Sequence, residues 1–273
     1  MSPPNPQPNP IRDTFDAVAG GYDAPALRFF VAAAGHMADR LGLRGNEHVL
    51  DVACGTGHVT LALGRQLSRG RVTALDFSPA MLAQARRKAA AAKLANVDFV
   101  ESDMQALAGP GRFDAAVCGF GLFFVEDMAA QLARVAATVK PGGRVMISNF
   151  AEGYMDPLRS LMMARLQRFG VRPPPQNWLC IARPQACQQL FASAGLREIA
   201  VEQRELGYFL ASAGEWWDVV WNAGFRRMLG RLAPAEQAAF RQQHLAEIEA
   251  VRAPGGIRMD VPVLFTSGTL PHG

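Results

Sequence analysis

Five short apolar segments alternate with helical patterns between residues 48 and 150. The apolar segments read, in order, "HVLDVAC", "RVTALDF", "VDFVESD", "FDAAVCGF" and "RVMISNF". Segments with a period near 3.6 residues lie among them, over residues 57–67, 79–94 and 127–139. Because the apolar segments are apolar on both faces, they are typical of strands in a parallel sheet that helices cover on both sides. The pattern predicts a doubly wound, Rossmann-like α/β fold.

The flanking parts of the chain show a different rhythm. A helical pattern at residues 27–41 precedes the alternating segments. After residue 150, the pattern predicts helices at residues 156–169, 185–194, 214–232 and 234–252, and strands at residues 197–209 and in "RMDVPVLFTSG". The late helices are interpreted as an insertion that covers one end of the sheet, not as a second domain.

Composition and charge narrow the class of protein. The chain has 273 residues, 49% of them hydrophobic, and a net charge of +4 without a long block of like charge. No apolar run reaches the roughly 18 residues of a membrane span. The N-terminal "MSPPNPQPNP" lacks the apolar core of a signal peptide, and its prolines predict a disordered tail at residues 1–10. The four cysteines have no Cys-x-x-Cys spacing, so no metal site or disulfide is expected, and the cytoplasm is the expected compartment.

The segment "HVLDVACGTGHVTLAL", residues 48–63, has the strand–turn–helix pattern of a nucleotide-binding site. Gly55 and Gly57 leave the backbone bare where a ligand must approach it, and the first amides of the next helix face that ligand. The third glycine or alanine of the dinucleotide motif is absent. Asp51 at the end of the strand disfavours a phosphate but suits a ligand that carries an amino group.

Two further acids follow later strands. Asp76 lies about 20 positions after Gly55, where a carboxylate can accept hydrogen bonds from ribose hydroxyls. Asp103 follows the third strand and could accept a hydrogen bond from an adenine amino group, while Met104 could pack on the ring. Three acids and a glycine turn together predict a site for a cationic amino-acid nucleoside.

Five motifs occur in order along the chain: "VLDVACGTG", "LDFSPAML", "ESDMQAL", "FDAAVCGFGLFFVED" and "VKPGGRVMISNF". Together they resemble the class I S-adenosylmethionine-dependent methyltransferases, in particular the branch typified by the ubiquinone/menaquinone biosynthesis methyltransferases. The resemblance covers roughly residues 12–150 and, weakly, the final strand. It implies S-adenosyl-L-methionine as the cofactor and a mostly parallel, seven-stranded sheet whose last strand is antiparallel.

The resemblance also implies which residues bind the cofactor. They are Tyr22, Asp51, Ala53, Gly55, Gly57, Thr60, Asp76, Phe77, Met81, Asp103, Met104, Gly119 and Phe120. The members between residues 51 and 60 would surround the methionine part, and Asp76 would hold the ribose. Those between residues 77 and 104 would flank the adenine. Gly119 and Phe120 would lie by the sulfonium, and Tyr22 would close over the cofactor carboxylate.

Aromatic residues before and after these motifs predict the acceptor site. The expected substrate-binding residues are Phe29, Phe123, Phe124, Trp178, Trp217 and Trp221. Aromatic faces can stabilise a sulfonium, and this set favours an apolar, planar or heteroaromatic acceptor. Phe123 and Phe124 stand where the quinone enzymes carry polar residues after "FGL", which disfavours a quinone precursor. No general base stands out, so no catalytic residue is assigned.

The expected function is transfer of a methyl group to an O, N, S or C atom of a small metabolite, in secondary metabolism. Residues 11–273 would form a single methyltransferase domain. Its parts would be a helical lid at 11–45, a cofactor-binding core at 46–150, a mixed helical acceptor region at 151–255 and a final strand at 256–273. The expected oligomeric state is a monomer or a homodimer, with no membrane partner.

Three other functions fit parts of the pattern. An NAD-type oxidoreductase uses the same fold, but the missing third glycine and the three acids count against it. A non-catalytic S-adenosylmethionine-binding module would keep the cofactor motifs without transferring a methyl group. An RNA methyltransferase would need a basic surface, and the scattered arginines do not predict one. Arg226, Arg227 and Arg231 are interpreted as a solvated face, with a handle for an anionic substrate as the alternative.

Overall fold

The computed structural model describes residues 9–109 and 111–272. The disordered tail expected at residues 1–10 lies outside the described residues except for its last two positions. Within the part of the chain that the structure describes, no helix has the length and apolar character needed to cross a membrane.

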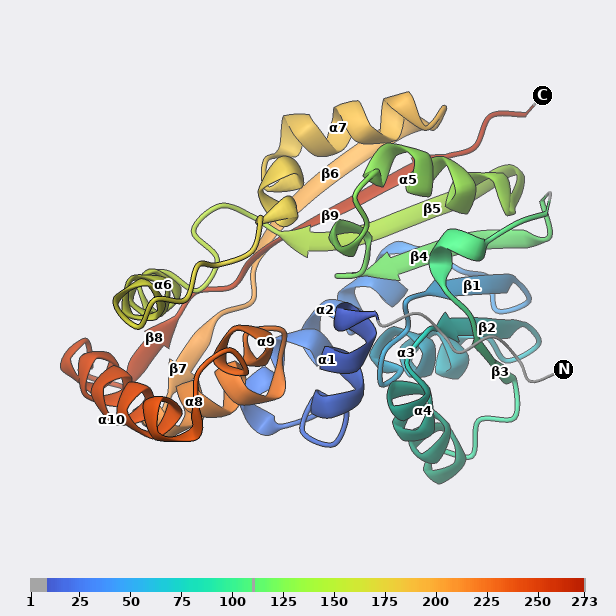
Figure 1. Ribbon diagram of the computed structural model, residues 1–273. Helices are drawn as coiled ribbons and strands as arrows, with labels where there is room; N and C mark the ends of the chain where they lie inside the picture. Colours follow the sequence, from blue (N-terminus) through green and yellow to red (C-terminus); the bar gives the residue numbers. More distant parts are fainter. Residues whose placement is uncertain (1–8, 110, 273) are drawn as a thin grey trace, which may run out of the picture.

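A seven-stranded sheet runs through the molecule in the order β3-β2-β1-β4-β5-β9-β6 (Figure 1). Its strands are β1 (His48–Val52), β2 (Arg71–Asp76), β3 (Val97–Glu101), β4 (Phe113–Gly119), β5 (Val139–Phe150), β6 (Arg197–Glu205) and β9 (Pro262–Thr269). The pairs among β1 to β5 are parallel, whereas β9 runs antiparallel to both β5 and β6. The expected Rossmann-like sheet with an antiparallel last strand is therefore confirmed.

Helices cover both faces of this sheet, as the two-sided apolar strands require. One face carries α2 (Phe29–Arg40), α3 (His58–Gln66) and α4 (Pro79–Ala91), and the other carries α5 (Met128–Ala137) and α7 (Pro184–Ser193) (Figure 1). Adjacent residues of β1 point to opposite sides: Val49 packs in the cluster that contains Leu82 of α4, and Leu50 packs with Leu132 of α5. The crossover order leaves the carboxyl ends of β1 and β4 side by side, where a doubly wound sheet binds its ligand.

Each late strand expected from the sequence is divided in two. After β6, the chain continues as β7 (Tyr208–Leu210), which pairs with β8 (Ile257–Met259) in a separate two-stranded sheet. The break is held by Glu205, whose Oε1 accepts hydrogen bonds from the amides of Gly207 (2.7 Å) and Val261 (2.6 Å). Gly207 is required there, because a Cβ would lie 2.3 Å from the carbonyl oxygen of Met259.

The remaining helices gather around this small sheet at one end of the molecule (Figure 1). They are α6 (Leu158–Arg168), α8 (Ala213–Asn222), α9 (Arg226–Leu229) and α10 (Pro234–Ala250). The single helix expected at residues 214–232 is wrong, because Ala223 adopts an extended conformation (φ −130°, ψ −170°) before Gly224 and ends α8. Trp216 of α8 donates its indole N–H to Nε2 of His244 on α10 at 2.8 Å, and both side chains are fully buried.

Short segments complete the fold near the carboxyl ends of the parallel strands. They are α1 (Pro10–Val18) and the 3₁₀ helices η1 (Pro25–Leu27), η2 (Met104–Ala106), η3 (Leu122–Phe124) and η4 (Asn177–Ile181). Asn9 caps α1 by accepting hydrogen bonds from the amides of Ile11 and Arg12.

Candidate functional site

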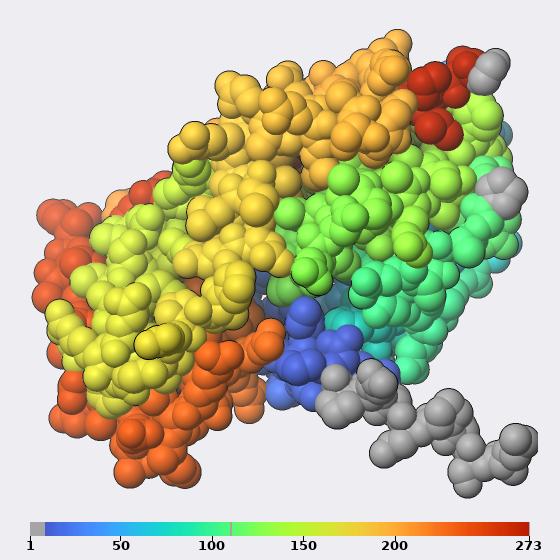
Figure 2. Space-filling model, turned by 45° about the horizontal axis from the view of Figure 1, so that its top comes forward, coloured from blue at the N-terminus to red at the C-terminus, as the bar shows by residue number. Residues whose placement is uncertain are grey.

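Three adjoining hollows open at the carboxyl ends of the parallel strands. We call them the strand-end pocket, of about 90 Å³, the turn pocket, of about 50 Å³, and the aromatic cavity, of about 660 Å³. The first lies against the ends of β2 and β3, the second against the glycine turn after β1, and the third among α1, η3, α6, η4 and α9. Tyr22 and Phe120 line all three, so these two residues mark the junction. Figure 2 shows a hollow where the blue, green, yellow and orange segments meet.

The turn after β1 is built from residues in the left-handed region. Ala53 (φ 54°), Gly55 (φ 55°) and Gly57 (φ 86°) lie there, and so does Phe120 (φ 54°) at the end of β4. For a residue other than glycine, such a conformation costs on the order of 1–3 kcal/mol and is found preferentially at functional sites. Gly121 lets the two turns approach, because a Cβ would lie 2.8 Å from both Cβ of Ala53 and Sγ of Cys118. The backbone is therefore shaped toward the pockets at two neighbouring strand ends.

Asp76 ties the glycine turn to the end of β2. Its Oδ2 accepts a hydrogen bond from the Gly55 amide and its Oδ1 accepts one from the Ser78 amide, both at 2.8 Å. The carboxyl group is only 5% exposed, and burial raises its pKa although the two amide bonds oppose that shift. A carboxylate oxygen has two lone pairs, so each oxygen can accept one more hydrogen bond from a ligand in the strand-end pocket.

Asp51 presents a buried oxygen without a partner to the turn pocket. Its Oδ2 accepts a hydrogen bond from Oγ1 of Thr60 at 2.5 Å, while its Oδ1 has no partner among the described residues. Burial raises the pKa of Asp51 to about 7. Oγ of Ser148, which lines the same pocket, is likewise buried without a partner. A buried polar atom without a hydrogen-bond partner lowers the stability of the fold. The two such atoms in this small pocket therefore indicate a site for a ligand that has polar groups of its own.

Tyr22 is held over the pockets by its neighbour Asp23. The carboxylate of Asp23 accepts hydrogen bonds from Oγ1 of Thr56 (2.6 Å) and Nζ of Lys88 (2.8 Å), and it pairs with Nε2 of His58 (2.8 Å). Burial opposes ionisation, but the bonds from His58, Lys88 and Thr56 outweigh it and hold the pKa of Asp23 well below its usual range. The segment before α2 is thereby fastened to the glycine turn and to α4.

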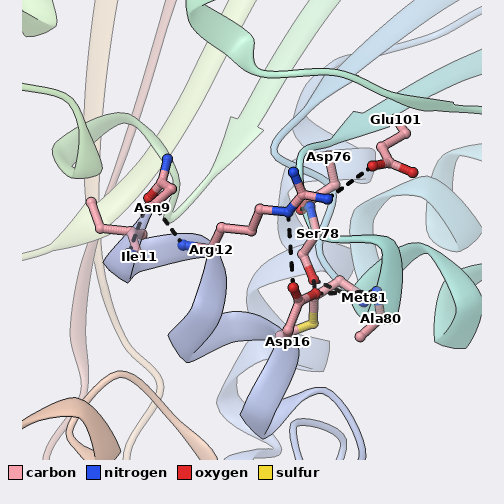
Figure 3. Close-up of polar contacts among 9 residues, drawn as sticks. All are labelled: Asn9, Ile11, Arg12, Asp16, Asp76, Ser78, Ala80, Met81 and Glu101. Carbon is pink, nitrogen blue, oxygen red and sulfur yellow. Dashed lines mark hydrogen bonds and ion pairs between the residues drawn. The ribbon is translucent and has the colours of Figure 1, made fainter. Parts of the chain in front are cut away.

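Helix α1 closes the strand-end pocket from above the sheet. Asp16 accepts a hydrogen bond from Oγ of Ser78 at 2.5 Å, and Arg12 pairs with Glu101 at 3.1 Å (Figure 3). Ser78 also caps α4 by accepting a hydrogen bond from the Met81 amide at 3.1 Å. These contacts fasten α1 to the ends of β2 and β3, and they place Asn9, Ile11 and Phe15 on the pocket wall.

The aromatic cavity is walled mainly by rings from segments far apart in the chain. Phe150 stacks on Tyr154 (centroids 3.8 Å apart), and Phe15 meets Phe124 edge to face (5.1 Å). Trp178 of η4 meets Tyr154 edge to face at 5.6 Å. A volume near 660 Å³ with aromatic walls is typical of a site for a small molecule.

Most of the cofactor-binding residues expected from the sequence line the two smaller hollows. The strand-end pocket is lined by Tyr22, Ala53, Gly55, Asp76, Phe77, Met81, Asp103, Met104, Gly119 and Phe120, and Asp51 lines the turn pocket. Gly57 and Thr60 line neither hollow. Gly57 is the N-cap of α3, where a Cβ would lie 3.1 Å from the Cβ of Ala85, and Thr60 donates its hydroxyl hydrogen to Oδ2 of Asp51.

The expected acceptor residues divide in two groups. Phe29, Phe123, Phe124 and Trp178 line the aromatic cavity. Trp217 and Trp221 do not line it. Trp217 is 8% exposed, stacks on Trp221 at 6.0 Å and lies 6.4 Å from Phe240, because this stripe of α8 faces α10. In this structure the two tryptophans therefore pack within the helical region and do not form part of the cavity wall.

Sequence reasoning missed several residues that the structure brings to the site. Ser148 is a polar residue inside an apolar strand, which is a feature that could have been recognised. Phe15, Tyr154 and Arg159 had no such pattern, because only packing of distant segments brings them to the cavity.

The described residues of this site provide neither a reactive cysteine thiolate nor a set of metal ligands. Burial raises the pKa of Cys118 to about 12, so its thiol is neutral and packs in the core. Across residues 9–109 and 111–272, no group of three or more His, Cys, Asp or Glu side chains could hold a metal ion.

Comparisons with known proteins agree with this geometry. A family model described as "Methyltransferase domain" matches residues 49–143. The demethylmenaquinone methyltransferase of Shouchella clausii is 29% identical over 213 residues, covering 70% of this chain and 90% of that protein. The nocamycin O-methyltransferase of Saccharothrix syringae is 26% identical over 271 residues, covering 94% of this chain and 97% of that protein.

A solved structure extends the comparison to the fold. The phosphoethanolamine N-methyltransferase 2 of Haemonchus contortus, in complex with phosphomonomethylethanolamine and S-adenosylhomocysteine, has a TM-score of 0.60 at 15% identity. The match covers 98% of this chain and 62% of that one. At this identity the likeness shows a common fold.

Proposed function

We propose that this chain, a class I S-adenosylmethionine-dependent methyltransferase of the branch that includes the ubiquinone/menaquinone biosynthesis enzymes, methylates a small aromatic or otherwise apolar metabolite. The observation that carries the proposal is the junction at Tyr22 and Phe120. There the two hollows that contain Asp51 and Asp76, and so suit an amino-acid nucleoside, adjoin an aromatic cavity that suits an acceptor.

The residues of the two smaller hollows fit the cofactor. We assign the ammonium group of its methionine part to the unpaired Oδ1 of Asp51, in the turn pocket that Ser148 shares. Asp76 would accept hydrogen bonds from the ribose hydroxyls with the free lone pairs of its two oxygens. Phe77, Met81, Asp103 and Met104 would flank the adenine. Gly57 and Thr60 would act indirectly, by shaping the turn and by orienting Asp51.

The bound cofactor supplies an electrophilic methyl group on a positively charged sulfur. Phe120 and Tyr22 lie where the pockets meet, so their rings would face this group and exclude water from it. Phe30 supports them, stacking on Tyr22 at 4.9 Å and meeting Phe120 edge to face at 5.3 Å. The protein's main contribution would be to hold the acceptor in line, which can lower the barrier by roughly 7–11 kcal/mol at best.

The cavity offers little to remove a proton from the acceptor. Among the described residues that line it, Glu126 is the single carboxylate and no histidine is present. The acceptor atom would therefore belong to a group that loses its proton without help or needs none, such as an acidic hydroxyl, an amine, a thiol or an activated carbon.

The names of the relatives support a small-molecule acceptor without fixing it. One relative is named for demethylmenaquinone and another for nocamycin O-methylation. The rings of Phe123 and Phe124 line the cavity here, and we propose a compact aromatic metabolite of secondary metabolism as acceptor. A cavity of about 660 Å³ has the size of a site for such a molecule.

We extend the proposal to the organisation of the chain. Residues 46–150 would bind the cofactor, residues 11–45 would form the lid, and residues 151–255 would select the acceptor. The contacts of Asp16 with Ser78 and of Asp23 with Thr56 support the lid assignment, since both fasten the early segment over the pockets. We propose the cytoplasm as compartment, since the four cysteines are free thiols, and a monomer or homodimer as the working form.

Two measurements test the proposed function. Calorimetric titration with S-adenosylhomocysteine and with NAD should give tight binding of the first and none of the second. Incubation with S-adenosylmethionine and a library of small aromatic metabolites should give a product heavier by one methylene unit in mass spectrometry. Tight NAD binding alone would contradict the cofactor assignment. Cofactor binding without any methylated product would favour a non-catalytic binding module.

A further inference from the structure

The wall of the aromatic cavity is rich in arginine on one side. Arg159 of α6, Arg227 of α9 and Arg231, which follows α9, all line it, against a single carboxylate from Glu126. All three arginines belong to the acceptor region, whereas Tyr22 and Phe120 at the junction belong to the lid and to the end of β4. The positive charge therefore lies on the part of the wall that the acceptor region builds.

These three guanidinium groups are not neutralised by the protein. Among residues 9–109 and 111–272, no carboxylate forms an ion pair with any of them. Other arginines of the same region do find such partners: Arg165 pairs with Glu247, and Arg252 pairs with Glu249. Among the described residues, Arg172, Arg226 and Arg241 of this region also form no ion pair, so what distinguishes the three arginines is their place on the cavity wall.

Two of these arginines are nevertheless held in place. The guanidinium of Arg159 lies 4.9 Å from the ring centroid of Trp178 and donates a hydrogen bond to Oε1 of Gln176. Arg231 donates to the carbonyl oxygen of Arg172 at 2.9 Å. These neutral partners orient the groups and leave their charges free. A guanidinium has five N–H donors, so each group keeps donors for a ligand.

We propose that the acceptor is an aromatic acid, an apolar planar molecule with an ionised acidic group that these arginines bind. An anion would pair with cations that the protein leaves without a carboxylate partner, and the planar guanidinium fork matches a carboxylate in geometry. The acidic group would lie by Arg159, Arg227 and Arg231, which turns the opposite end of the molecule toward Phe120. This inference rests on the proposed function, because it assigns the acceptor of that same site.

A matched pair of fluorescent probes tests the charge alone. 8-Anilinonaphthalene-1-sulfonate and N-phenyl-1-naphthylamine share one aromatic skeleton and differ by the sulfonate. With S-adenosylhomocysteine saturating, the sulfonate probe should bind at one site per chain and more tightly than the neutral probe. Arg227→Gln should weaken the sulfonate probe roughly three- to tenfold and leave the neutral probe within twofold. Arg227→Lys, which keeps the charge, should retain most of the difference.

Matched controls separate this result from damage to the fold. The side chain of Arg172 is exposed and lies outside the cavity wall, so Arg172→Gln removes a neighbouring charge without touching the site. It should change neither probe. Unchanged binding of the neutral probe by Arg227→Gln shows that the cavity is intact, and Arg159→Gln provides a second, independent variant.

The proposal fails if both probes bind equally well, or if Arg227→Gln and Arg159→Gln weaken both probes by the same factor. Either result leaves the proposed function standing when S-adenosylhomocysteine still binds. If the wild-type protein did not bind S-adenosylhomocysteine, that result would instead contradict the proposed function. Among candidate acceptors, hydroxynaphthoic and hydroxybenzoic acids should be methylated on the hydroxyl faster than their primary amides, and the reverse preference would also overturn the inference.

Discussion

The cofactor half and the acceptor half of the site are built in different ways. In the first half, backbone amides and carboxylates converge from the ends of β1, β2 and β3, and contacts such as Gly55 to Asp76 fix them at 2.8 Å. In the second half, rings from α1, η3, β5 and η4, together with Phe225 just before α9, form a wide wall with few hydrogen bonds. The difference indicates that, in the function proposed here, a few strong polar contacts would determine cofactor binding, whereas many weak apolar contacts together would hold the acceptor.

The largest effect should come from the buried acid at the end of β2. Asp76→Asn should weaken S-adenosylhomocysteine binding by about 1.5–3 kcal/mol, because charge-assisted hydrogen bonds to the ribose are lost. Asparagine is preferred to alanine here, since its amide oxygen can still accept one of the two hydrogen bonds that Asp76 accepts from the amides of Gly55 and Ser78. Calorimetric titration measures the change.

Asp103→Asn is the matched control for that substitution. Asp103 is half-buried and accepts a hydrogen bond from the Gln105 amide at 2.8 Å, so solvent can replace much of its contact with a ligand. We expect a loss of less than about 1 kcal/mol. Equal losses for the two variants would mean that burial does not decide the strength of these contacts.

The next largest effect concerns stability and should be confined to the acceptor half. Trp216→Phe removes the donor that satisfies buried His244 and should lower the free energy of unfolding by about 1–3 kcal/mol. Urea unfolding followed by circular dichroism measures it, with the half-exposed Trp221→Phe as control. S-Adenosylhomocysteine affinity should stay within twofold. A parallel loss of cofactor affinity would show that the two halves are energetically coupled.

The affinity for S-adenosylhomocysteine should change about tenfold when the pH changes from 6 to 8. Burial raises the pKa of Asp51 to about 7, so near pH 6 its carboxyl group is mostly protonated and must lose a proton to pair with an ammonium group. S-Adenosylhomocysteine affinity should therefore rise with pH, and calorimetry in buffers of different ionisation enthalpy should detect the released proton. Asp51→Asn should flatten the profile.

The same group has the opposite effect on the ligand-free fold. The native protein keeps this proton up to about pH 7, whereas the unfolded chain loses it near the usual pKa of 3.8. Stability contributed by Asp51 is therefore present at low pH and is lost as the pH rises through this window. A thermal unfolding series that showed Asp51 stabilising the free protein above pH 7 would contradict this assignment.

The smallest effect should come from a single ring of the acceptor wall. Trp178→Leu removes one ring among many and should weaken binding of N-phenyl-1-naphthylamine by about 1 kcal/mol, with cofactor affinity unchanged. Fluorescence titration measures it. A loss beyond about 3 kcal/mol would show that one contact dominates the acceptor half, contrary to the picture of shared weak contacts.

The same contrast explains which parts of the site could be predicted from the sequence. The strand ends and the acids at Asp51, Asp76 and Asp103 were predictable because each lies within a few residues of an apolar strand and a turn. The acceptor wall was predicted only in part. Trp217 and Trp221 follow a helical stripe, and a stripe cannot tell packing against α10 from a cavity wall.

Other features depended on contacts between distant segments. The break of the expected helix after Asn222 and the division of the two late strands, at Gly207 and between Met259 and Pro262, follow from tertiary geometry. The meeting of Phe15 with Phe124, 109 positions apart, and the unpaired state of Arg159 likewise have no local pattern. The turn containing Gly55, by contrast, could be placed from its strand and helix alone.

The most direct test of the account is a crystal structure of the protein with S-adenosylhomocysteine. We predict that its amino group lies within hydrogen-bonding distance of Oδ1 of Asp51, that its ribose hydroxyls contact Asp76, and that its sulfur lies by Tyr22 and Phe120. A ligand bound elsewhere, with Oδ1 of Asp51 still unpaired, would contradict the central claim.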